Sequence, residues 1–129
     1  MEAVKKLAEE LHAENAEWLG RLKYFEDELA KLDTRLGEIL SKNNSREVSA
    51  MIEHFQNQFI RQKEVIHGLK HHTRRDDQGI AMAENVPAQS SDGRMLPDHR
   101  YLRDNVETFE RIYADLKSEF EHFIAKTLN

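Results

Sequence analysis

The sequence of 129 residues contains no cysteine, only two prolines and five glycines. The absence of cysteine excludes disulfide bonds, thiol nucleophiles and thiolate metal ligands. The scarcity of proline and glycine favours long helices, because both residue types destabilise a helix interior. No apolar run approaches the ~20 residues that a membrane-spanning helix needs, so we expect no membrane partner.

The chain also lacks an excess of positive charge. It carries 24 acidic and 19 basic residues, a net charge of −5 with histidine neutral. Because a basic excess supplies much of the affinity for phosphate backbones and anionic lipids, nucleic acid is not an expected partner. The first residues are amphipathic and show no apolar core of a signal peptide, so a cytoplasmic location is the default expectation.

What the sequence does contain is an apolar stripe that recurs at alternating steps of three and four residues. Steps of this kind place the stripe on one face of a helix and favour near-parallel packing against other helices. The stripe passes through three segments, and its members are Val4, Leu11, Trp18, Leu22, Phe25, Leu29, Leu32, Leu36 and Ile39; Val48, Ile52, Phe55, Phe59, Ile66 and Leu69; and Leu102, Val106, Phe109, Tyr113, Leu116, Phe120 and Phe123.

These segments predict one helical domain that spans residues 1–129, with helices at about 2–42, 45–75 and 98–128. The short break at Asn43-Asn44-Ser45 makes the first two helices an antiparallel hairpin, with Asn44 as the cap of the second helix. The sequence therefore predicts an all-α fold, an antiparallel helical hairpin plus a third long helix. This is a coiled-coil-like three-helix bundle that is able to dimerise into a larger bundle.

The periodicity stops between residues 76 and 96, where glycine, proline and serine gather. This composition predicts a long loop, which is unusual inside a compact domain. Pro97 and Asp98 then resemble the start of the third helix, with Asp98 as its cap.

Histidines and carboxylates from distant segments converge at one end of the expected bundle. If the helices run up, down and up, that end gathers His12, Glu14, His72 and His99. Imidazole and carboxylate groups together can hold a divalent metal ion. The same groups can instead form a polar layer that fixes helix register, or a solvated end of the bundle, and the spacing leaves these alternatives open. No organic cofactor is indicated.

Catalytic motifs are missing from the sequence. It has no Gly-x-Ser-x-Gly elbow, no glycine-rich phosphate loop and no nucleophile next to a base and an orienting group. We therefore expect a protein that is not an enzyme.

Apolar residues outside the shared core predict an interaction surface. A second helix that ends near residue 75 leaves Val4, Leu7 and Leu11 without a cover, and Tyr24 and Ile60 fall at outer positions. The favoured function is a helical protein–protein interaction or assembly module that self-associates, most simply as a homodimer, with another protein as a further partner. The alternative is a bundle that binds a metal or small ligand through its histidine-rich end.

Overall fold

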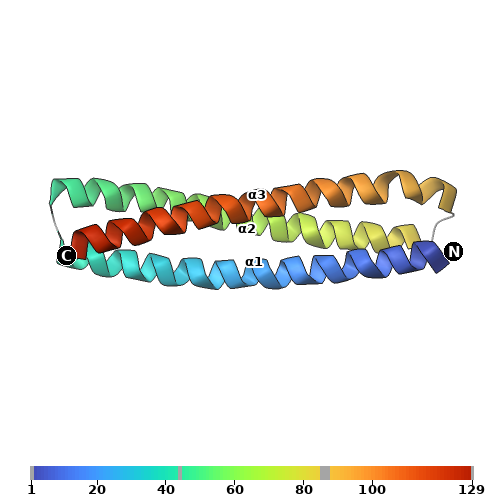
Figure 1. Cartoon of the computed structure of the whole chain (residues 1–129), viewed down its shortest axis with the longest axis horizontal. Helices are drawn as coiled ribbons and strands as arrows, with labels where there is room; N and C mark the ends of the chain where they lie inside the picture. Colours follow the sequence, from blue (N-terminus) through green and yellow to red (C-terminus); the bar gives the residue numbers. More distant parts are fainter. Residues whose placement is uncertain (1, 44, 85–87, 129) are drawn as a thin grey trace.

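The computed structural model contains three long helices that lie side by side (Figure 1). Helix α1 spans Glu2–Lys42, α2 spans Arg46–Glu84 and α3 spans Ala88–Leu128. The predicted all-α fold, a helical hairpin plus a third helix, is confirmed. The structure describes the backbone of residues 2–43, 45–84 and 88–128, and the side chains of residues 3, 5–43, 45–83 and 97–127.

The turn between α1 and α2 is short and capped on both sides. The backbone N–H of Asn43 donates to the carbonyl of Ile39 at 3.0 Å and closes α1. The backbone N–H of Val48 donates to the hydroxyl of Ser45 at 3.2 Å. Ser45 is therefore the N-cap of α2, because its side chain satisfies a free amide of the first turn. The predicted cap, Asn44, lies outside the described residues.

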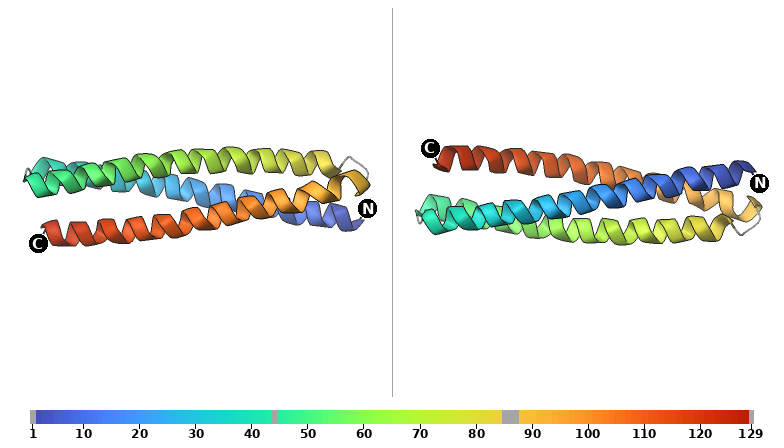
Figure 2. Two further views of the ribbon diagram at one scale, coloured as in Figure 1. Left: turned by 90° about the horizontal axis from the view of Figure 1, so that it is seen from above. Right: turned by 90° about the horizontal axis from the view of Figure 1, so that it is seen from below.

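Ion pairs between α1 and α2 show that the two helices run antiparallel. Lys63 Nζ lies 3.1 Å from Asp33 Oδ2, and Lys70 Nζ lies 3.2 Å from Glu26 Oε1, so residue numbers fall on one helix as they rise on the other. Helix α3 returns along this hairpin. Its carboxyl end therefore lies at the α1–α2 turn, and the amino terminus lies at the opposite end of the bundle (Figure 1). Figure 2 shows the three helices crossing one another gently over their whole length.

The main apolar core follows the predicted stripe. Phe25, Leu32 and Val48 pack against it while partly exposed, and the side chain of Val4 lies outside the described residues. The buried members of this core are Trp18, Leu22, Leu29, Leu36, Ile39, Ile52, Phe55, Phe59, Ile66, Leu69, Leu102, Val106, Phe109, Tyr113, Leu116, Phe120 and Phe123.

The predicted end of the second helix and the predicted loop at 76–96 are wrong. Helix α2 continues to Glu84, because the three-and-four stripe continues through Leu69, Thr73, Asp76 and Ile80 with polar residues at two of its positions. Those polar residues interrupt the apolar pattern, and the glycine and serine content of the segment adds to the appearance of a loop. Residues 85–87 of the predicted loop lie outside the described residues.

The predicted start of the third helix is also wrong. Helix α3 begins at Ala88, so Pro97 and Asp98 lie inside it. The low local helix propensity of this segment does not prevent its backbone from continuing the helix towards the amino terminus. Among the described residues, no helix has the length and apolar content needed to cross a bilayer.

Candidate functional site

A buried polar layer crosses the bundle where the apolar stripe is interrupted on all three helices. It consists of Glu14 and Asn15 of α1, Asp76 and Asp77 of α2, and His99 of α3. His99 Nδ1 lies 2.7 Å from Asp76 Oδ2, and His99 Nε2 lies 2.6 Å from Glu14 Oε1. The amide of Asn15 donates to Asp76 at 3.0 Å and to Asp77 at 3.1 Å. The layer thus ties each helix to the other two.

His99 is enclosed between the three helices. The residue is 0% exposed, and Trp18 stacks on its ring with centroids 4.8 Å apart. Each ring nitrogen of His99 has a carboxylate oxygen as its partner, one from α1 and one from α2.

Arg103, one turn after His99 on α3, completes the layer at its edge. Its Nε and Nη2 donate to Glu14 at 3.0 and 2.6 Å, which is the fork geometry that guanidinium offers a carboxylate. The hydrogen bonds from Arg103 lower the pKa of the Glu14 carboxyl below its ordinary range. Burial acts in the opposite direction, and His99 adds a further lowering of this pKa.

We expect this arrangement to lose stability in acid. The pKa of Glu14 is lower in the folded state, so the unfolded chain binds more protons as the pH falls through about 4.3, the ordinary value for Glu. The stabilisation is present above that range and is lost below it. Arg103→Met should lower the free energy of unfolding at neutral pH by about 1 kcal/mol, a value reduced to allow for the partial exposure of Arg103. The variant should also lose less stability than the wild type as the pH falls. Urea unfolding at a series of pH values measures both effects.

The matched control is Lys23→Met, since Lys23 forms a fully exposed pair with Asp27 on α1. This control is expected to leave the acid loss unchanged. Equal pH dependence in the wild type and Arg103→Met would contradict the assigned role of Arg103.

The four predicted metal ligands are only partly brought together. Glu14 and His99 are bonded to each other, and His12 Nδ1 lies 2.6 Å from Asp77 Oδ1. His72 is exposed and lines a different surface, between α2 and α3. Among the side chains that the structure describes, no three of the types His, Asp and Glu are placed to hold a metal ion. The hydrogen bonds favour the register-layer interpretation of this end.

Sequence reasoning missed three members of this site, namely Asp76, Asp77 and Arg103. The two aspartates fell in the segment interpreted as a loop, and Arg103 was not considered. A usable signal was present for Asp76, because it continues the stripe between Leu69 and Ile80. A polar residue in an otherwise apolar stripe is a candidate for a buried layer.

The predicted interface at the amino terminus is covered within the chain. Leu11 is 5% exposed, and Leu7 packs on a small second core with Ala8 and Ile80. The expectation of an uncovered stripe is therefore wrong for Leu7 and Leu11, because α2 extends far enough to cover them. The side chain of Val4 lies outside the described residues.

Tyr24 and Ile60 lie on the surface, as predicted from their outer positions. They are 58% and 54% exposed, and the Tyr24 hydroxyl donates to Glu28 at 2.7 Å. Their role as interface residues remains a prediction.

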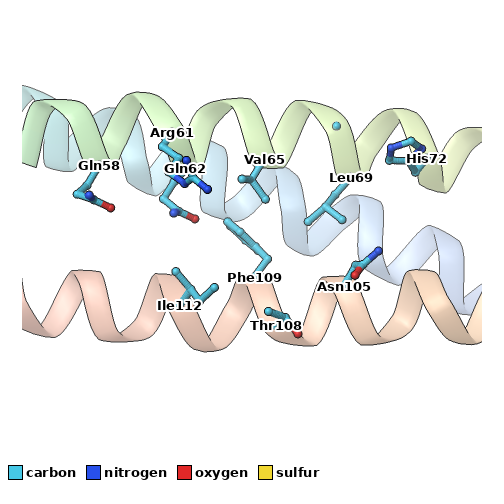
Figure 3. A pocket seen from close by; sticks show the side chains of 11 residues that line it. Gln58, Arg61, Gln62, Val65, Leu69, His72, Asn105, Thr108, Phe109 and Ile112 are labelled. Atoms are coloured by element: carbon cyan, nitrogen blue, oxygen red, sulfur yellow. The ribbon is translucent and has the colours of Figure 1, made fainter.

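A groove of about 380 Å³ opens between α2 and α3 (Figure 3). Its lining combines apolar side chains with neutral polar and basic ones, and it contains no acidic residue. The lining residues are Gln58, Arg61, Gln62, Val65, Gly68, Leu69 and His72 of α2, and Asn105, Thr108, Phe109 and Ile112 of α3. Figure 3 shows Phe109 reaching from α3 towards α2 in the middle of the groove.

Gln62 is the polar residue at a core position of this groove. The sequence pattern identifies it as an exception in the stripe, and the structure buries it to 4% exposure. In Figure 3 its amide points towards α3. Gly68 widens the groove, because a Cβ built at this position meets nothing within 4 Å.

The arrangement defines an all-α bundle with a polar layer across its three helices and a lateral groove between α2 and α3. Comparison with protein-family models, curated proteins and solved structures gave no match.

Proposed function

We propose that the chain is a non-enzymatic helical protein–protein interaction module whose binding surface is the α2–α3 groove. The observation that carries the proposal is an apolar strip in the lining of the groove, in which Ile112 occurs together with Leu69 and Phe109, two residues that are buried in the core. Ile112 is 46% exposed, so part of the strip contacts water in the free protein. A strip of this kind is typical of grooves that accept the apolar face of an amphipathic helix.

The dimensions of the groove support a helix as the ligand. From Gln58 to His72 the lining of α2 extends over about 21 Å, at 1.5 Å per residue. That length corresponds to about four helical turns. A helix docked along it would complete a four-helix arrangement.

The proposal also changes the surface that supports association. The homodimer expected from the sequence had two grounds, an uncovered stripe near the amino terminus and any stripe that the third helix leaves open, and α2 covers Leu7 and Leu11 of the first. The α2–α3 groove takes the place of that stripe as the surface for a partner.

Site-specific photo-crosslinking tests the proposed function. A benzoyl-phenylalanine at Gln58, in the groove, is expected to give one discrete adduct in cells that make the protein naturally. The same group at Lys31, an exposed position of α1, is expected to give none. The adduct is identified by mass spectrometry and its protein partner is purified. That partner should bind the intact chain with a Kd of order micromolar and lose binding to Ile112→Glu.

No adduct at Gln58, or the same adducts from both positions, contradicts the proposal. An adduct between two copies of the chain would assign the groove to self-association instead.

A further inference from the structure

We infer that the groove takes an acidic amphipathic helix of a different protein, with a carboxylate against Arg61 and a polar group against Gln62. The inference rests on the proposed function, since it names the partner chemistry for the same groove.

The charge of the groove is opposite in sign to that of the whole chain. The chain has a net charge of −5, whereas the lining contains Arg61 and His72 and no Asp or Glu. Among the described residues, Arg61 forms no hydrogen bond or ion pair, and it is exposed at the margin of the groove. A free guanidinium of this kind pairs well with an incoming carboxylate, because its donors match the two oxygens.

The same charge argues against a second copy in the groove. A two-fold dimer presents the same patch on both subunits, so each groove would have to complement itself. Neither copy of the groove has an acidic lining residue, so a second copy offers Arg61 no carboxylate from this patch. Like charges that come together at an interface repel each other, and this repulsion disfavours binding of that partner.

Gln62 supplies a second, independent argument for a ligand. It occupies the stripe position between Phe59 and Ile66, where an apolar residue would extend the core. Its side chain is 4% exposed, and its amide has no hydrogen-bond partner among the described residues. A polar side chain on the docked helix can form a hydrogen bond with this amide, and that bond fixes the alignment of the helix in the groove.

Gly68 provides the room for a close approach. Apart from its chain neighbours and the local helix backbone, a Cβ at this position meets no heavy atom within 4 Å, so an added methyl group fits the free protein. The docked helix would use that space. A side chain placed there should therefore block binding without disturbing the fold.

The test uses a displayed library of helices about 15 residues long, about the length of the α2 side of the groove. Each carries an apolar face and randomised flanking positions, and selection is made against the purified full chain. We expect the selected helices to be enriched in Glu and Asp on one flank. A synthetic peptide of the strongest sequence is then titrated by fluorescence anisotropy.

Paired variants locate the peptide. Arg61→Glu is expected to weaken the acidic peptide about tenfold and to favour a version with Lys in place of Glu. Arg74→Glu, on the opposite face of α2, is the charge-matched control and should leave the Kd unchanged. Gly68→Leu should abolish binding, whereas Gly20→Leu on α1, whose Cβ position is equally open, should not. Circular dichroism confirms that all four variants fold.

Helices selected without an acidic preference, or equal losses from Arg61→Glu and Arg74→Glu, would overturn the inference. The proposed function would survive that result if a crosslinked partner still binds at Gln58. A concentration-dependent dimer in sedimentation, lost in Ile112→Glu, would make the second copy the occupant and overturn the acidic-helix inference. If no helix is selected and no adduct forms at Gln58, both the acidic-helix inference and the proposed function are contradicted.

Discussion

Replacing His99 with alanine is expected to lower the free energy of unfolding by about 3–5 kcal/mol. The change removes a ring that bonds both Glu14 and Asp76, at 2.6 and 2.7 Å. Each carboxylate then loses one of its hydrogen bonds, and the buried space of the ring and its stacking on Trp18 are lost as well, so the cost is that of a buried polar contact together with a cavity. Urea unfolding followed by circular dichroism measures the loss.

His54→Ala is the matched control for this variant. The ring of His54 also bonds a carboxylate on another helix, Glu119 at 3.1 Å, but both side chains are more than 40% exposed. This change is expected to alter stability by less than about 0.5 kcal/mol. The fluorescence of Trp18, which stacks on His99, should shift only in His99→Ala. Similar losses in the two variants would contradict the structural role of the layer.

Phe120→Ala is expected to destabilise the protein by about 3–5 kcal/mol for a different reason. Phe120 is 0% exposed, and its ring lies 5.1 Å from Phe55 and 5.2 Å from Phe59, measured between centroids. Alanine leaves a cavity that long helices close only in part, so both the transfer free energy and the ring contacts are lost. Thermal and urea unfolding should agree on the size of the loss.

Ile60→Ala controls for the general effect of shortening a large apolar side chain. Ile60 is 54% exposed, so its truncation is expected to cost less than about 1 kcal/mol. If Phe120→Ala cost no more than Ile60→Ala, the aromatic end of the core would not be packed as described.

The fold was predictable because the stripe repeats over many turns. Leu22, Leu29 and Leu36 keep strict heptad spacing, and a repeat that continues over so many turns rarely arises by chance. The hairpin was predictable for the same reason, since one short break separates two stripes. The extent of α2 was not, because Thr73 and Asp76 occupy stripe positions and remove the apolar signal there.

The polar layer could be predicted only as a group of residues near one end. His12, Glu14, His72 and His99 were expected there, but the bond between Glu14 and His99 depends on the rotation of α3 about its axis. Spacing along one helix carries no information on that rotation. Asp77, the partner of His12, could be identified only from the true end of α2, because it lies beyond the predicted end of that helix.

The groove lay beyond sequence reasoning for a geometric reason. Its volume depends on the separation of α2 and α3, which is set by the side chains of all three helices together. Gln62 gave the one local sign, since it interrupts the stripe where the groove opens. A buried amide within an apolar stripe predicts a polar neighbour, but it does not show on which side of the helix that neighbour lies.

An odd number of helices places the two ends of the chain at opposite ends of the bundle (Figure 1). Each of α1 and α3 has 41 residues and is therefore about 60 Å long. Anything joined to the two ends is held apart by that distance. A force that pulls the two ends apart acts along the helix axes. The helices would have to slide past one another, so the contacts along the whole core resist this force together. The bundle that has a groove on its side therefore resists extension along its length.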